Sequence, residues 1–170
     1  QNIKWIHFGS VGYERVLKSN LNLSSLIITN SSNTMDNGMI NHAIYLIFSL
    51  IRSGYGIEEI RKKKNLTRNS FESYRDTIIN IEDSSILIIG LGNIGLKLGK
   101  NLSFLGAKVD GVKRNIAKQK IKNIREIFKI KDLNKIVHKY DIVISLLPFD
   151  INLKYIYDSL FFKQMKKDSF

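Results

Sequence analysis

The chain alternates short apolar runs with segments whose apolar residues are spaced as on a helix. The runs are rich in isoleucine, leucine and valine, which is typical of strands that are buried on both faces of a sheet. Strands that alternate with helices favour an α/β fold with a parallel sheet. The runs predict five strands, at residues 3–8, 26–29, 86–89, 107–112 and 141–147. A shorter sixth strand is predicted at residues 127–130.

The clearest long helical pattern covers residues 39–52, where apolar residues recur at intervals of three and four. Its broad apolar face predicts a well-buried helix. Asp36 or Asn37 is expected to cap its start, because short polar side chains accept hydrogen bonds from first-turn N–H groups. Gly54 and Gly56 are expected to end it.

Residues 55–81 change character, since they are polar and basic and show little periodicity. We therefore expect a connecting arm between two larger units. Shorter helices are expected after the glycine loop at residues 9–12, at residues 132–139 and at residues 159–165. Asp132 is expected to cap the helix at residues 132–139.

The apolar run at residues 86–89 leads into a glycine-rich turn that matches G-x-G-x-x-G. A helical pattern follows, closed by Gly106, and then the strand at 107–112. In such a turn the first glycine allows a tight bend, the second lets the backbone approach a pyrophosphate, and the third allows close helix–strand packing. Since strand, turn, helix and strand all fit, we predict dinucleotide binding rather than an ordinary strand–helix turn. The turn is Gly90, Leu91, Gly92, Asn93, Ile94 and Gly95.

The composition narrows the classes of function. The 170 residues carry a net charge of +12, with many lysines between residues 108 and 139, but there is no aromatic interleaving. This pattern favours a solvated lysine-rich surface over nucleic-acid binding, so we predict no nucleic-acid partner. No apolar run is long enough to span a membrane, so no membrane partner is predicted. The absence of cysteine excludes thiolate metal sites and agrees with a cytoplasmic location.

Four segments in chain order resemble the D-isomer-specific 2-hydroxyacid dehydrogenases, the family of glyoxylate/hydroxypyruvate reductases and phosphoglycerate dehydrogenase. They are WIHFGSVGYERVL (5–17), ITNSSNTMDNGMINHAIYLIFSLIR (28–52), LIIGLGNIGLKLGKNLSFLGAKVDGVKR (87–114) and DIVISLLPFDINLKYIYDSLFFKQMKKDSF (141–170). The resemblance implies a partial Rossmann-type nucleotide-binding domain at residues 82–170. Before it would come the arm at 55–81 and, at residues 1–54, the end of a flavodoxin-like substrate domain with the inter-domain helix.

The resemblance also implies roles for particular residues. Val11 and Gly12 match the loop that holds the substrate carboxylate through backbone N–H groups. Leu147 and Pro148 match the turn that lies against the adenosine. Met39 matches a position near the nicotinamide, although its helical spacing favours an ordinary core methionine.

The residues at the end of the strand at 107–112, the second strand of the predicted nucleotide-binding domain, decide between NAD and NADP. Asp110 has the nominal spacing of a ribose-binding acid, but it falls in the middle of the strand. Aligned on the family pattern, the tip is Lys113, Arg114 and Asn115. Two cations there suit a 2′-phosphate, so we predict NADP, with NAD as the alternative. That alternative gains weight if Lys113 only reflects the general excess of lysine.

The expected full-length function is hydride transfer between nicotinamide and C2 of a D-2-hydroxy or 2-oxo acid, by a homodimer. None of His7, His42 and His138 fits the catalytic acid–base. The chain starts with Gln and ends within what looks like an element, so we expect a fragment cut at both ends. In the family the catalytic arginine, glutamate and histidine come later in the chain, so this fragment is expected not to catalyse. The alternative is a non-catalytic, dinucleotide-binding regulatory protein of the same fold, like the family's corepressor relatives.

Overall fold

The protein contains two parallel sheets of different size. The computed structural model describes residues 3–12, 16, 22–64, 66–115, 120–148, 150 and 153–170. The smaller sheet pairs two strands, and the larger one has the strand order β5-β4-β3-β6. This arrangement confirms the predicted α/β class and places all six expected strands within a few residues of their predicted bounds. The strands are β1 (Trp5–Phe8), β2 (Ile27–Asn30), β3 (Ser85–Ile89), β4 (Lys108–Lys113), β5 (Ile127–Lys129) and β6 (Ile142–Ser145).

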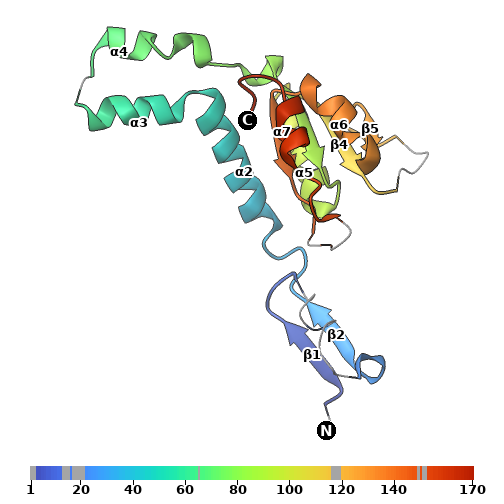
Figure 1. Ribbon diagram of the computed structural model, residues 1–170. Coiled ribbons are helices and arrows are strands. Elements are labelled where there is room, and N and C mark those ends of the chain that lie inside the picture. Colours follow the sequence, from blue (N-terminus) through green and yellow to red (C-terminus); the bar gives the residue numbers. More distant parts are fainter. Residues whose placement is uncertain are drawn as a thin grey trace.

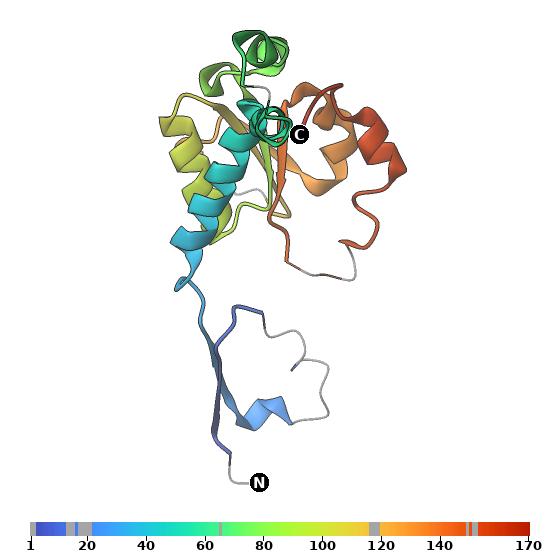
Figure 2. The same cartoon turned by 90° about the vertical axis from the view of Figure 1, so that its left-hand side faces the viewer.

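Helices cover both faces of the larger sheet (Figure 2). On one face, α2 (Asp36–Ile51) and α5 (Asn93–Phe104) pack over Ile86 and Ile88 of the central strand. On the other face, Leu87 and Ile89 pack against the short helices that follow. The alternation of β3 side chains between two apolar layers explains why the strand reads as a continuous apolar run. The second layer consists of η4 (Ile130–Asp132), α6 (Leu133–Ile136), η5 (Val137–Lys139) and α7 (Ser159–Gln164).

The start and the burial of α2 differ from the prediction. Asp36 is the first helical residue, and the N-cap is Met35, which makes no side-chain cap bond. Only one stripe of the helix is buried, so the expectation of a well-buried helix is wrong. The opposite face exposes large apolar side chains because nothing in the described chain packs on it. The buried stripe comprises Asp36, Ile40, Ile47 and Ile51.

The segment predicted to be a connecting arm, which shows little periodicity in sequence, is largely helical. Helix α2 ends at Ile51, and α3 (Gly54–Lys62) starts after Ser53, which has a φ of 53°. Gly54 and Gly56 therefore do not end a helix. They allow close packing, since a Cβ on Gly56 would lie 2.3 Å from the Tyr74 ring. The rest of the arm is α4 (Arg68–Glu72), η2 (Arg75–Thr77) and η3 (Ile81–Asp83).

The two-stranded sheet lies apart from the larger sheet, at the far end of α2 (Figure 1). Its strands are joined through η1 (Leu23–Ser25), and a polar cluster ties them together. Thr29 Oγ1 accepts a hydrogen bond from Trp5 Nε1 at 2.9 Å and contacts His7 Nδ1 at 2.9 Å. The helix expected after residue 12 falls mostly outside the described residues.

Two helix starts in the second layer contrast with each other. Asp158 caps α7 by accepting a hydrogen bond from the backbone N–H of Phe161 at 2.8 Å. Asp132 precedes α6 but makes no side-chain cap bond, so its predicted capping role is wrong. None of the helices in the described part of the chain combines the length and apolar character needed to cross a bilayer.

Candidate functional site

The glycine turn after β3 has the geometry that its motif requires. Gly90 has a φ of 110°, a conformation that other residues rarely adopt, and a Cβ there would lie 2.8 Å from the Leu146 carbonyl oxygen. A Cβ on Gly95 would lie 2.2 Å from the carbonyl oxygen of Gly90, so α5 can approach the turn only with glycine at this position. A Cβ on Gly92 would meet no atom within 4 Å. The backbone at Gly92 is therefore open to a ligand.

The N-terminus of α5 opens into a cleft of about 450 Å³. Gly92 is the N-cap and offers no side-chain bond to the first turn. Unpaired N–H groups and the positive end of the helix dipole therefore face the cleft, which is the usual anion-binding arrangement. The cleft lining includes Gly90, Gly92, Asn93, Ile94 and Gly95 on one side and Ser145, Leu146 and Leu147 at the end of β6.

The loop after β1 reaches the same cleft through Val11. Two polar side chains hold its carbonyl groups: Asn30 Nδ2 donates to the Val11 carbonyl at 2.7 Å, and Ser10 Oγ donates to the Gly12 carbonyl at 3.0 Å. Because these carbonyls are bonded to the protein, the loop is suited to present N–H groups to a bound anion. The structure thus brings Val11 to the glycine turn, 79 positions later in the chain (90 − 11).

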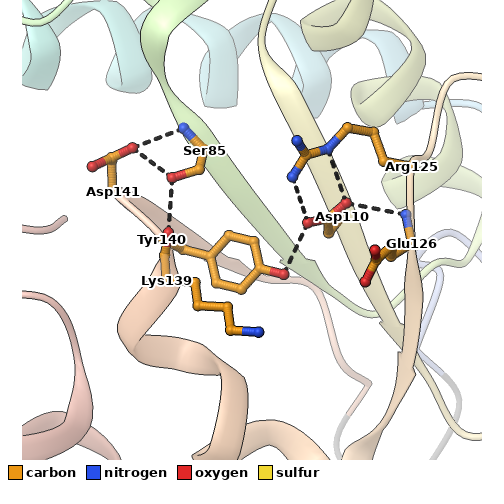
Figure 3. Close-up of polar contacts among 7 residues, drawn as sticks. All are labelled: Ser85, Asp110, Arg125, Glu126, Lys139, Tyr140 and Asp141. Carbon is orange, nitrogen blue, oxygen red and sulfur yellow. Dashed lines mark hydrogen bonds and ion pairs between the residues drawn. The ribbon is translucent and has the colours of Figure 1, made fainter.

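Asp110 belongs to a buried network inside the larger sheet (Figure 3). Its carboxylate accepts hydrogen bonds from Arg125 Nη2 at 2.8 Å, from the Tyr140 hydroxyl at 2.9 Å and from the backbone N–H of Glu126 at 3.0 Å. Burial, and then the neighbouring Asp110 carboxylate, raise the pKa of Tyr140 above its ordinary value. Asp110 is the third of the six residues of β4, and these contacts engage its carboxylate within the domain.

A second polar group in Figure 3 joins β3 to the start of β6. Asp141 accepts hydrogen bonds from the Ser85 backbone N–H at 2.8 Å and from Ser85 Oγ at 2.6 Å, and it pairs with Lys166. Burial acts to raise the pKa of the Asp141 carboxyl, but the bonds from Lys166 and Ser85 outweigh it and lower that pKa. This group lies at the amino end of the strands, opposite the cleft, and its role is structural.

The cations predicted for a 2′-phosphate lie at the carboxyl end of β4. Lys113 is the last residue of the strand and is half-buried, and Arg114 follows in an exposed position. Main-chain bonding ties this end to the glycine turn, because Gly90 N donates to the Val112 carbonyl at 3.0 Å. Arg114 Nη2 also pairs with Asp150, which the sequence did not reveal.

Leu147 and Pro148 follow β6 at the same edge of the sheet. Leu147 lines the cleft at the glycine turn, and both residues line a neighbouring cleft of about 760 Å³ that includes Asp150 and Tyr155. Parallel α/β sheets bind ligands outside the carboxyl ends of their strands, so these residues lie where a ligand is expected.

The structure adds residues that sequence reasoning missed. Asp36 is 5% exposed, lines the cleft and pairs with Lys97 of α5 at 2.9 Å. Asn33 bonds to Asn93 in the first turn of α5. Met39 is 53% exposed and also lines the cleft, so its assignment to the core is wrong. The only sequence signal was the density of polar residues before α2.

No histidine in the described residues lies in the cleft lining. His7 contacts Thr29 and Ser31 in the small sheet, and His42 and His138 are exposed. Among the described residues, no group of three or more His, Asp or Glu side chains is arranged to hold a metal ion. The open backbone at Gly92 and the N-terminus of α5 make the cleft suited to an anionic ligand at a Rossmann-type turn.

The sequence profile of the family described as D-isomer specific 2-hydroxyacid dehydrogenase, NAD binding domain, matches residues 44–170. Since this range covers most of the chain, the protein belongs to that family, and the resemblance drawn from its motifs is confirmed. A comparison with curated protein sequences finds no match.

Solved structures show the same fold. A D-isomer specific 2-hydroxyacid dehydrogenase family protein from Aeromonas salmonicida subsp. salmonicida aligns with a TM-score of 0.81 and 19% identity, over 98% of this chain and 50% of that one. A probable 2-hydroxyacid dehydrogenase from Rhizobium etli, in complex with NADP, HEPES and L(+)-tartaric acid, aligns with a TM-score of 0.78 and 22% identity. The alignment covers 99% of this chain and 50% of that one. An NADPH-dependent glyoxylate/hydroxypyruvate reductase from Sinorhizobium meliloti, in complex with NADP and sulfate, aligns with a TM-score of 0.76 and 20% identity. The alignment covers 96% of this chain and 48% of that one.

The chain therefore spans about half the length of these relatives. The fold is that of their NAD-binding domain with the segment that precedes it.

Proposed function

We propose that this chain forms the cofactor-binding part of an oxidoreductase that transfers hydride between nicotinamide and C2 of a D-2-hydroxy or 2-oxo acid. The observation that carries the proposal is the shared cleft. It combines a Rossmann-type glycine turn, the end of β6 and the loop at Val11. No observation favours the regulatory alternative, since the relatives described above are dehydrogenases or reductases by their descriptions.

Different residues of the cleft would bind different parts of the cofactor and the substrate. The backbone at Gly92, Asn93 and Ile94, at the positive end of α5, would hold the pyrophosphate. Leu147 and Pro148 would lie against the adenosine. The N–H groups of Val11 and Gly12 would hold the carboxylate of the acid. When bound, the nicotinamide cofactor supplies the hydride.

We further propose that NADP is preferred over NAD. Lys113 and Arg114 place two cations at the end of β4, and Asp110 is held in a buried network instead of facing a ribose. A 2′-phosphate gains from such cations, whereas a 2′-hydroxyl needs a carboxylate acceptor. The relatives from R. etli and S. meliloti are described in complex with NADP. Equal dissociation constants for NADPH and NADH would contradict this preference.

A Gly92→Asp substitution tests the phosphate site. The new side chain has free space in the protein and an extended backbone suited to a helix N-cap, so stability should rise by about 0.3 kcal/mol. Its carboxylate would face the pyrophosphate, so NADPH affinity should fall at least about tenfold. Fluorescence titration of NADPH measures the affinity, and thermal unfolding measures the stability.

Gly38→Asp is the matched control for this substitution. Gly38 is also exposed, and a Cβ there would meet no atom within 4 Å, but it lies in α2 and does not line the cleft. NADPH affinity should be unchanged by it. If both variants, or neither, weakened NADPH binding, the assignment of the glycine turn would be wrong.

We also propose that the chain is divided at residues 1–54, 55–81 and 82–170, and that the full-length protein forms a homodimer. The dimer proposal is supported by exposed apolar residues on α2 and the arm. Three of them, Leu46, Leu50 and Tyr55, line a mainly apolar cleft of about 690 Å³ that also includes Phe170. The exposed residues are Tyr45, Leu46, Leu50, Tyr55, Ile57 and Phe71.

Leu50→Glu tests the dimer, because a carboxylate on this face would be desolvated on association. We expect light scattering to show a dimer for the full-length protein and a monomer for its Leu50→Glu variant. Phe104→Glu is the control, since Phe104 is exposed on α5 outside that cleft. A full-length protein that is monomeric at every concentration tested would rule the proposal out. A cytoplasmic location stays a prediction from the composition.

A further inference from the structure

An ion pair crosses the carboxyl edge of the larger sheet. Arg114 follows β4, and Asp150 follows β6; these strands lie on opposite sides of β3 in the order β5-β4-β3-β6. Neighbouring strands are about 4.8 Å apart, so the pair spans roughly twice that distance across the end of β3. The glycine turn begins at the end of β3. The pair therefore lies beside the proposed phosphate site.

The two partners differ in exposure. The Arg114 side chain is 63% exposed, whereas the Asp150 side chain is only 19% exposed and lines the cleft at Leu147 and Pro148. The carboxylate is thus the more fixed partner, and the guanidinium the more accessible one. A ligand phosphate that binds Arg114 would compete with a carboxylate that is already in contact with it.

We propose that Asp150 is a specificity-determining residue that limits the preference for NADP over NAD. Its carboxylate competes with the 2′-phosphate for Arg114 and repels that phosphate. The same carboxylate can accept a hydrogen bond from the 2′-hydroxyl of NAD, the role usually given to an acid at the end of the second strand. The acid would then come from the loop after β6. This inference rests on the proposed dinucleotide site.

The expected size of this competition is modest. An exposed ion pair changes an equilibrium constant by no more than about fivefold, and repulsion between the carboxylate and a dianionic phosphate adds to that. Removing the charge of Asp150 should therefore tighten NADPH binding about three- to tenfold. NADH should bind equally well or up to about threefold more weakly, because the neutral amide is a poorer acceptor. The preference for NADPH should rise accordingly.

The test measures the dissociation constants of NADPH and NADH for four proteins: the natural chain, Asp150→Asn, Arg114→Gln and the double variant. The effect of Asp150→Asn on NADPH should be mostly lost in the Arg114→Gln background, because the competition needs the guanidinium. It should also shrink at high salt. Asp150→Ser repeats the removal of charge with a smaller side chain, and thermal unfolding checks that each variant folds.

Asp76→Asn is the matched control for net charge, since Asp76 is exposed on η2 in the arm. It should leave both affinities unchanged. If Asp150→Asn left NADPH affinity unchanged, or tightened NADPH and NADH equally, the inference would be overturned while the dinucleotide site stood. If the natural chain bound neither cofactor and Gly92→Asp made no difference, the proposed function itself would fail and the inference with it.

Discussion

The central strand of the four-stranded sheet buries four consecutive side chains, whereas neither strand of the two-stranded sheet contains a buried residue. Both sheets are parallel, so the pairing pattern does not explain the difference. The larger sheet has an apolar layer on each face, and the smaller sheet is tied by hydrogen bonds among exposed side chains. Two-stranded sheets without a packed face are marginal in water. The cofactor turn therefore rests on the stable region and the proposed carboxylate loop on the weaker one.

The largest effect should come from the core of the stable region. Ile88→Ala removes a fully buried side chain between β3 and α5 and should cost about 3 kcal/mol of unfolding free energy. Ile27→Ala in the small sheet should cost less than about 0.5 kcal/mol, because Ile27 is 64% exposed. Urea unfolding followed by far-UV circular dichroism measures both.

Trp5 offers a separate readout of the small sheet, since it is the only tryptophan and lies in β1. Its fluorescence should change at lower urea than the circular dichroism does. Coincident transitions, with equal costs for the two alanine variants, would show that the two regions unfold as one unit and would break the comparison.

A smaller effect, dependent on pH, is expected from the Asp110 network. Tyr140→Phe removes one hydrogen bond to a buried carboxylate and should cost about 1 kcal/mol near neutral pH. The pKa of Tyr140 is raised in the folded protein, chiefly by burial and then by Asp110. Because the pKa of Tyr140 is higher in the folded state, the folded protein keeps this proton to a higher pH than the unfolded chain does. The stabilisation from the bound proton is complete below the tyrosine pKa of the unfolded chain and is lost as the pH rises above that pKa.

The measurement compares unfolding free energies of the natural chain and Tyr140→Phe from about pH 8 to about pH 11, a range that brackets the ordinary tyrosine pKa. The difference in unfolding free energy between the two proteins (the gap) should be constant up to about pH 9.5 and then narrow. The reason is that only the natural chain loses stability as this phenol ionises in the unfolded state. An Ile27→Ala chain titrated in parallel should keep a constant gap. A gap that widened above about pH 10 would contradict the assigned direction of the pKa shift.

An effect comparable to or smaller than that of Tyr140→Phe is expected where the two regions meet. Lys97→Met removes the cation that pairs with the buried Asp36 at the start of α2 and should cost about 0.5–1 kcal/mol. Because Lys97 is half-exposed, water can replace part of the interaction. Hydrogen exchange should quicken at residues 33–40 and stay unchanged in β3. Lys100→Met, on the exposed side of α5, is the control and should leave exchange unaltered at both places.

Much of the larger sheet could be predicted from the chain, because its strands are defined by local runs of apolar residues. The glycine turn was also predictable, since its requirements at Gly90 and Gly95 are steric and act over a few residues. The arm was not, because glycine usually marks a helix end. Here Gly56 is required by the ring of Tyr74, which lies 18 positions away (74 − 56).

The site shows the same division. The sequence alone determined the turn and the strand ends, and hence the class of ligand, because backbone conformation follows from local sterics and periodicity. Only the tertiary structure decided which charges meet: Asp110 with Tyr140, Asp36 with Lys97 and Arg114 with Asp150. Such partners are 30 to 61 positions apart, and an ion pair leaves no periodic trace in the sequence. The physical reason is that a charge is selected by its neighbours in space, which the fold supplies.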